Sequence, residues 1–187
     1  LDLYGVGREP TDSYGRRCLI ARRLVERGVR FVQLYINAQI WDNHTSLATG
    51  LKAACDRTDK PAAALIQDLK RRGLLDSTLV LWGGEFGRLP IAQLSPDRDE
   101  SKAGRDHNKN AFVALMAGGG VKGGTTHGMT DDLGMSAVVD RVSVPDWHAT
   151  VLHLLGLRHE ELFVDYNGLK EKLTGVNSAR VVKEVLA

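Results

Sequence analysis

Segments with helical periodicity alternate along this chain with short apolar runs, and this alternation constrains the fold more than any other feature of the sequence. Residues 29–36, 78–82 and 111–117 are largely apolar, as buried strands are. Strands that alternate with helices typically form parallel sheets, because each helix carries the chain back across the sheet. We therefore expect an α/β sandwich with a mainly parallel sheet.

Three helices are expected, over residues 12–27, 46–72 and 147–155, with shorter helices from residue 160 onward. Each of the three is followed by a glycine, which is typical of a helix end. The second helix is predicted to be interrupted at Lys60-Pro61, because proline suits the first turn of a helix better than its interior. The glycine run 118–120 lacks the Gly-Lys-Ser/Thr ending of a phosphate loop and is interpreted as a turn.

Length and charge limit the kinds of partner. With 187 residues the chain fits one domain, residues 1–187. Its net charge is +2 and its basic residues are dispersed, which argues against a nucleic-acid partner, because phosphate binding needs clustered Lys and Arg. No apolar run approaches the roughly 18 residues of a membrane span. Since the chain begins with Leu1 and its first methionine is Met116, we expect the later part of a longer protein.

The two cysteines carry no recognisable site. Cys18 and Cys55 are too few for a disulfide framework and lack the C-x-x-C spacing of zinc or redox sites. Both fall among apolar residues of expected helices. We predict small buried thiols.

Three short polar segments lie beside expected strand ends, where an α/β fold gathers its chemistry: residues 41–44, 83–88 and 104–108. Asp42 and His44 are two residues apart, so on an extended segment both side chains point to one side and reach one cation. Glu85 directly follows a strand, and Asp106 and His107 precede one. This arrangement suggests a metal site.

The ligand types indicate a class of chemistry. We predict Asp42, His44, Glu85 and His107 as ligands of one or two divalent ions, with zinc, manganese, magnesium or calcium as candidates. Arg88 and Arg105 would hold an anionic ester group. Two ions about 4 Å apart, or one ion plus an arginine, stabilise a transferring phosphoryl or sulfuryl group.

Each polar segment also has a plain structural interpretation. Asp42 would cap the helix that starts near Ser46, and His44 would satisfy the same helix end. Glu85 would form an ordinary salt bridge with Arg88. Asp106 and His107 would be a solvated pair on a loop.

The other histidines and one further aspartate favour structural roles. Asp146 and His148 lie at a helix start, where an acidic side chain complements the helix dipole. His153 is predicted to lie in the core and His159 at the surface. For His127, a place in the site and a place facing solvent are both open.

Several segments in this order resemble the DUF1501 family. They are residues 21–32, the Trp-Asp-x-His segment, residues 79–88 with Gly-Glu-Phe-Gly-Arg, Gly-Arg-Asp-His-Asn, and residues 146–156. The family belongs with the sulfatase and alkaline phosphatase superfamily, so the resemblance implies a three-layer, alkaline-phosphatase-like fold of which this chain is the C-terminal portion.

The same resemblance implies residue roles. Glu85 is similar to the acidic ligand at the end of a core strand, His107 to the later histidine ligand, and Asp42 with His44 to an Asp/His ligand pair. Phe86 stands where the superfamily usually has a second ligand. The nucleophile and the first metal aspartates would lie upstream, and the parent protein would be periplasmic or secreted.

Two hypotheses follow. The first is a metal-dependent hydrolase of small-molecule or glycan sulfate or phosphate esters, with a mutase or phosphonate-cleaving enzyme of the same superfamily as a variant. The second is a non-catalytic binding or structural protein in which the carboxylates and imidazoles make internal hydrogen bonds. Convergence of the four predicted ligands favours the first.

Overall fold

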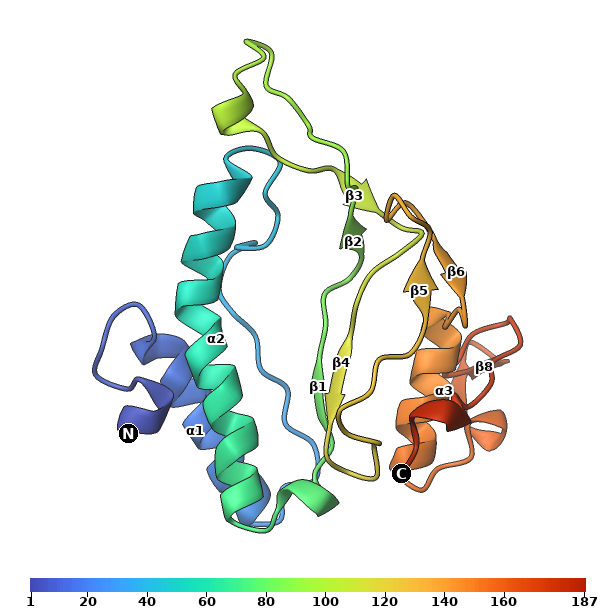
Figure 1. Cartoon of the computed structure of the whole chain (residues 1–187). Helices are drawn as coiled ribbons and strands as arrows, with labels where there is room; N and C mark the ends of the chain where they lie inside the picture. The colour runs from blue at the N-terminus through green and yellow to red at the C-terminus, as the bar shows by residue number, and fades with distance from the viewer.

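Two helices packed against each other form the most buried part of the molecule. The computed structural model describes residues 1–187. Helices α1 (Asp12–Glu26) and α2 (Leu47–Arg71) lie side by side along one edge of the molecule (Figure 1). An apolar core joins them to the one-turn helix η1 (Asp2–Tyr4), and its buried members are Tyr4, Cys18, Leu19 and Ala64. Both helices were expected at these places.

Helix α2 is continuous, so the predicted interruption at Lys60-Pro61 is wrong. Proline removes one hydrogen bond of the helix. However, Pro61 is buried and lies one turn before Ala64, which belongs to the core beside α1. Packing of this face stabilises the helix more than the missing hydrogen bond weakens it, and propensity alone does not include that packing.

All strands belong to two-stranded antiparallel ladders. The pairs are β1 (Val80–Trp82) with β4 (Leu115–Ala117), β2 (Gly87–Arg88) with β3 (His107–Asn108), β5 (Met129–Thr130) with β6 (Ala137–Val139), and β7 (Phe163–Tyr166) with β8 (Leu169–Lys172). The expected three-layer α/β sandwich with a mainly parallel, alkaline-phosphatase-like sheet is therefore wrong. Apolar periodicity identifies a strand, but it does not give the direction of the neighbouring strand.

The apolar runs at 78–82 and 111–117 do contain strands, β1 and β4, but these belong to one long hairpin. Val80 pairs with Ala117 and Trp82 with Leu115. The chain between them extends away, forms the β2–β3 ladder and returns (Figure 1). Figure 1 draws the blue segment that follows α1 between this hairpin and α2. The hairpin carries two of the three polar segments.

Residues 29–36 are extended but do not form the predicted buried strand. Their backbone makes no hydrogen bond to another strand. Leu34 packs against the helical core, whereas Phe31 and Tyr35 are 71% and 67% exposed. The segment has the composition of a central strand, but no strand pairs with either of its edges.

Helix α3 (Val144–Leu154) begins with a capping box. Ser143 Oγ accepts a hydrogen bond from the Asp146 backbone N–H (3.2 Å), and Asp146 Oδ2 accepts one from the Ser143 N–H (2.9 Å). The other carboxylate oxygen of Asp146 accepts the backbone N–H of Arg180 at 2.8 Å. The structural role predicted for Asp146 is confirmed.

The C-terminal segment differs from the expected series of helices. It contains the hairpin β7–β8, whose two-residue turn is Asn167-Gly168 with φ values of 50° and 78°. Asn-Gly is the preferred sequence for such a turn, so this signal was present in the sequence. Single-turn helices complete the chain: η2 (Leu75–Ser77), η3 (Glu100–Lys102), η4 (His159–Glu161) and η5 (Lys183–Val185).

The glycine run 118–120 forms a turn, as predicted. All three residues have left-handed φ values, of 71°, 52° and 86°. A Cβ atom on Gly118 would lie 2.3 Å from the carbonyl oxygen of Leu75. Only glycine fits this turn, which connects β4 to the next segment.

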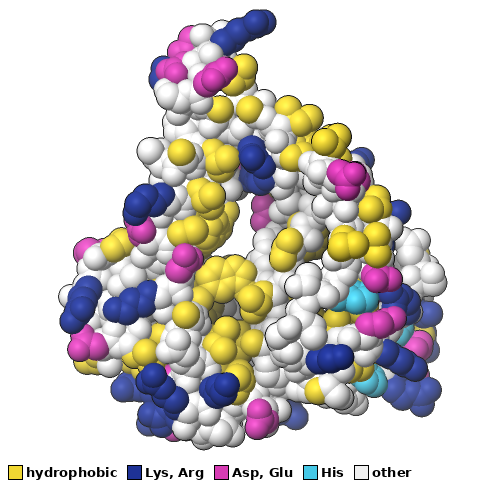
Figure 2. Space-filling model, in the orientation of Figure 1, with side chains coloured by type: hydrophobic (Ala, Val, Ile, Leu, Met, Phe, Trp, Pro, Cys, Tyr) yellow, Lys and Arg dark blue, Asp and Glu magenta, His cyan; other side chains and the backbone are white.

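Much of the molecule remains exposed. Only 20 of 187 residues are buried, and the accessible surface is 12760 Å². A compact monomer of this mass exposes about 8,800 Å². Figure 2 shows hydrophobic side chains along the middle of one face, between the helix pair and the C-terminal half. None of the helices combines the length and the apolar character needed to span a lipid bilayer.

Candidate metal centre

The β2–β3 ladder places two of the predicted site residues directly opposite each other. Arg88 on β2 pairs with His107 on β3. Residues opposite each other in an antiparallel ladder project from the same face. Both side chains therefore extend toward the loop that precedes α2.

Backbone contacts hold that loop against the returning strand of the hairpin. The N–H of Arg105 donates to the carbonyl of Asn43 at 3.0 Å, and Thr45 forms a β-bridge with Ala103. Gly104 makes this approach possible, because a Cβ atom there would lie 2.0 Å from the carbonyl carbon of His44. The contact brings the Asp42–His44 turn beside His107.

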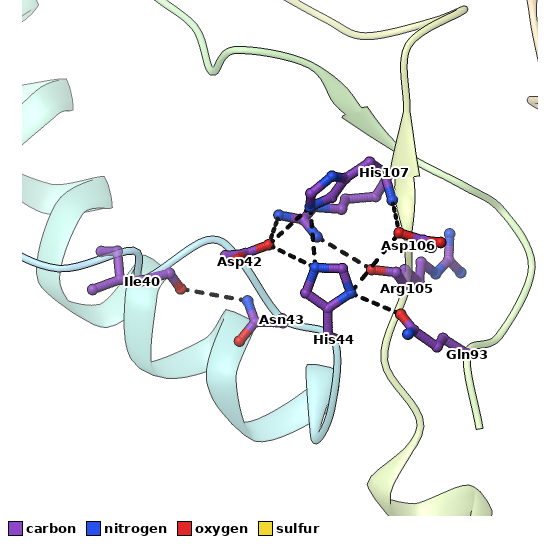
Figure 3. A network of polar contacts seen from close by, with 9 residues as sticks. Ile40, Asp42, Asn43, His44, Gln93, Arg105, Asp106 and His107 are labelled. Carbon is purple, nitrogen blue, oxygen red and sulfur yellow. Dashed lines mark hydrogen bonds and ion pairs between the residues drawn. The ribbon is translucent and has the colours of Figure 1, made fainter. Parts of the chain in front are cut away.

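Three predicted ligands converge at this point (Figure 3). Asp42 Oδ1 lies 3.1 Å from His44 Nε2 and 3.2 Å from His107 Nε2. The two imidazole nitrogens are 3.0 Å apart. The three atoms form a nearly equilateral triangle, a geometry that can hold a metal ion.

Arg88 contacts the same oxygen of Asp42. Its guanidinium donates to Oδ1 at 2.5 Å and also to the carbonyl of Arg105 at 3.2 Å. The hydrogen bond from Arg88, followed by the one from His107, holds the pKa of Asp42 below its ordinary value. Asp42 is therefore a carboxylate near neutral pH.

The two histidines are oriented by different neighbours. His44 Nδ1 lies 2.8 Å from Gln93 Oε1 and 3.9 Å from Asp106 Oδ1. The ring of His107 packs against the ring of Phe86, with centroids 4.2 Å apart. Phe86 stands where the superfamily usually has a second metal ligand, and here its ring contacts the imidazole of His107.

The fourth predicted ligand is not part of the triangle. Glu85 is exposed and lies in the wall of a cleft of about 410 Å³, which is also lined by Trp41, Phe86, Asp42 and His107. It makes no ion pair with Arg88, so the salt-bridge alternative is wrong. Glu85 lines the same cleft as Asp42 and His107 without belonging to the triangle.

Arg105 is adjacent in the chain but points elsewhere. Its guanidinium donates to the carbonyl of Leu89 at 3.4 Å, and Figure 3 shows the side chain directed away from the histidines. Only its backbone contributes to the cluster. The predicted pair of anion-binding arginines is therefore reduced to Arg88 at this place.

Other structural alternatives are also resolved. The N-cap position of α2 is Ser46, with no side-chain cap, so Asp42 does not cap this helix. Asp106 accepts the backbone N–H of His107 at 2.7 Å and is otherwise largely exposed.

The remaining histidines lie outside the triangle. His153 is exposed and His159 is buried beside Glu160, so the predictions for both were wrong. His148 is exposed, and His127 has a buried Nε2 atom without a hydrogen-bond partner. The cluster therefore uses two of the six histidines.

A comparison with protein-family models matches nearly the whole chain. The model described as "Protein of unknown function (DUF1501)" matches residues 1–186. The chain belongs to the DUF1501 family. No curated protein and no solved structure matches this DUF1501 chain.

Sequence reasoning missed Gln93 altogether. Gln93 lies in residues 89–103 of this DUF1501 chain, a polar stretch with two prolines, and nothing in the sequence marks one amide among its polar residues. In the structure Gln93 forms a β-bridge with Gly104, two residues before Asp106. That contact across the hairpin brings the Gln93 side chain within hydrogen-bond distance of His44.

Proposed function

We propose that Asp42, His44 and His107 bind one divalent metal ion in a hydrolase of sulfate or phosphate esters. The triangle of ligand atoms, with sides of 3.0, 3.1 and 3.2 Å, carries this proposal. Ligand atoms about 2.05 Å from a tetrahedral zinc ion are separated by about 3.3 Å. An ion placed about 1 Å above the triangle would contact all three atoms at this distance.

The donor set favours zinc over the harder ions. Two imidazoles and one carboxylate suit zinc, whereas magnesium and calcium prefer all-oxygen sites. Three protein ligands also leave a coordination position open, as catalytic zinc sites do. The carboxylates of Asp42 and Asp106 against the single guanidinium of Arg88 give the site an excess of negative charge, which attracts a cation.

The chain's own residues suit an anionic ester. A bound ion would supply Lewis-acid stabilisation of the transferring group and would activate a water molecule. Arg88 stands beside the triangle, where its guanidinium can shift from Asp42 to an ester oxygen. Trp41 and Phe86 line the adjoining cleft and offer apolar surface to the alcohol part of the ester.

Metal analysis and an esterase assay test the proposal. The purified full-length protein is expected to bind zinc, measured by elemental analysis after dialysis, and to hydrolyse an aryl phosphate or aryl sulfate. Asp42→Asn and His107→Ala are expected to weaken zinc binding at least about 100-fold, because each removes a direct ligand. His153→Ala, an exposed histidine on α3, is the matched control.

A non-catalytic role is the second candidate. The observations that favour it are the Asp42–Arg88 ion pair and the His44–Gln93 hydrogen bond, which already satisfy two of the polar groups. Absence of both zinc and turnover in the full-length wild-type protein would count against the hydrolase and favour this alternative. Zinc binding without turnover would retain the metal site and remove the hydrolase assignment.

A further inference from the structure

Gln93 is held in place by its backbone. Its N–H donates to the carbonyl of Gly104 at 2.8 Å, and the N–H of Gly104 donates back at 2.9 Å. Gly104 itself packs against the backbone of His44. Because these contacts link the loop, the hairpin and His44, the position of the Gln93 side chain relative to the imidazole is fixed on both sides.

The hydrogen bond from His44 to Gln93 determines which ring nitrogen is free. Gln93 Oε1 is an acceptor only, so Nδ1 of His44, 2.8 Å away, carries the proton. The carboxylate of Asp106, 3.9 Å from the same nitrogen, adds to this preference, whereas Asp42 Oδ1, 3.1 Å from Nε2, opposes it until a cation binds between them. A neutral imidazole with Nδ1–H has its lone pair on Nε2, the atom that faces Asp42 and His107.

We propose that Gln93 is a positioning residue of the metal centre, which fixes the tautomer and the ring orientation of His44. This inference rests on the metal site proposed above. Gln93 contacts none of the three ligand atoms. It acts through the other ring nitrogen of His44, by keeping Nε2 unprotonated and directed toward the ion. The reverse amide orientation, with the Gln93 NH₂ group donating to Nδ1, would put the proton on Nε2 and block coordination.

His107, the second histidine of the triangle, is held in a different way from His44. His107 has no hydrogen bond at Nδ1 and is held by ring packing on Phe86 instead. Packing restricts the plane of a ring but does not select a protonated nitrogen. The ring of His44 lies beside that of His107, with centroids 4.8 Å apart, and its Nδ1 is hydrogen-bonded to Gln93.

Three variants of the purified protein test this role. Zinc affinity is measured by competition with a chromophoric chelator for the wild type, Gln93→Leu, Gln93→Glu and Gln67→Leu. Gln93→Leu is expected to bind zinc about 10–100-fold more weakly, as loss of an outer hydrogen-bond partner does. Gln93→Glu retains an acceptor oxygen and is expected to restore binding to within about 3-fold of the wild type. Gln67, exposed on α2, is the control and is expected to change nothing.

A second measurement does not require metal. Nitrogen chemical shifts of the His44 ring in the metal-free protein at pH 8, assigned by their loss in His44→Ala, report the balance between the two tautomers. Asp42 Oδ1, 3.1 Å from Nε2, competes with Gln93 for the ring proton, so the Nδ1–H share is expected to be larger in the wild type than in Gln93→Leu. A structural role alone would alter stability without this change in the ring.

The outcomes separate the two proposals. Wild-type zinc binding together with unchanged affinity or an unchanged tautomer in Gln93→Leu overturns the role of Gln93. If the wild type binds no zinc, the proposed metal function fails. The ring shifts then decide alone whether Gln93 positions His44.

Discussion

Asp42 Oδ1 receives three neighbours in this structure: the Arg88 guanidinium and the Nε2 atoms of His44 and His107. A carboxylate has about four lone-pair sites, so one oxygen and its partner can serve both an arginine and a metal ion. Arg88 thereby holds the carboxylate in the orientation that the two imidazoles share. The hydrogen bond from Arg88 also lowers the pKa of Asp42 and so keeps it ionised, as the proposed metal ion requires.

Removal of that charge is expected to change the titration of Asp42. Arg88→Gln should raise the pKa of Asp42 toward its ordinary value, because the hydrogen bond from Arg88 is the main cause that lowers it. A pKa lowered by folding means that the ionised group stabilises the fold above the ordinary pKa and that this stabilisation is lost as pH falls through the folded value. Carboxyl carbon shifts across an acid titration measure it.

Arg105→Gln is the matched control for that titration. The Arg105 guanidinium points away from Asp42 and contacts the Leu89 carbonyl instead. Its replacement is expected to leave the Asp42 pKa unchanged. An equal effect from both variants would mean that general positive charge, and not the contact, controls the carboxylate.

At this scale, residue type could be predicted and side-chain direction could not. Asp42, His44 and His107 were recognisable because carboxylate and imidazole are the usual ligands of zinc. Arg105 and Arg88 have the same chemistry, but β-ladder register puts only Arg88 opposite His107. Gln93 became a neighbour of His44 through a bridge across the hairpin, which no local pattern encodes.

At the scale of elements, a charged network joins α1 to α2. Arg22 donates to Asp68 at 2.8 Å and also pairs with Glu26, and Tyr4 donates its hydroxyl hydrogen to Asp68 at 2.8 Å. Arg72 reaches both carboxylates, at 3.0 and 2.7 Å. Burial, and then the contact with Asp68, raises the pKa of Tyr4, so its hydroxyl stays neutral and donates to the carboxylate.

Loss of Arg22 is expected to destabilise this helix pair. The arginine is 6% exposed, and Arg22→Ala leaves the half-buried Asp68 with fewer partners. We expect a loss of about 2 kcal/mol in the free energy of unfolding, equivalent to a Tm lowered by about 4–8 °C. Denaturant and thermal unfolding measure it. The neighbouring exposed Arg23, replaced by alanine, should change stability by less than about 0.5 kcal/mol.

Which elements could be predicted depends on how local their causes are. The start of α3 follows from its capping box, and the ends of α1 and α3 follow from the glycines after them, all of which act within one turn. The continuity of α2 through Pro61 depends on packing against α1, a contact between distant segments. Strand pairing is equally non-local, so β1 and β4 were located but their antiparallel direction was not.

At the scale of the whole molecule, the solvent-accessible surface area is unusually large. The accessible area of 12760 Å² exceeds the value for a compact monomer by about 4,000 Å². Residues 29–36 contribute to this excess, because a strand-like sequence lies on the helices without a partner at its edges. The apolar side chains of residues 29–36 favour burial, as the sequence pattern indicates. They stay partly exposed because no neighbouring strand covers them.

Hydrogen exchange distinguishes an unpaired segment from a paired strand. The amides of residues 30–36 have no hydrogen-bond acceptor, so they are expected to exchange within about a minute at neutral pH, whereas the amides of α2 around Ala64 exchange far more slowly. Exchange followed by mass spectrometry on peptides from both regions measures this contrast. Val80–Trp82, which is paired with β4, supplies an internal standard for a short ladder. Slow exchange in residues 30–36, comparable to that of α2, would show that this segment acquires a strand partner in solution and would contradict the unpaired edge.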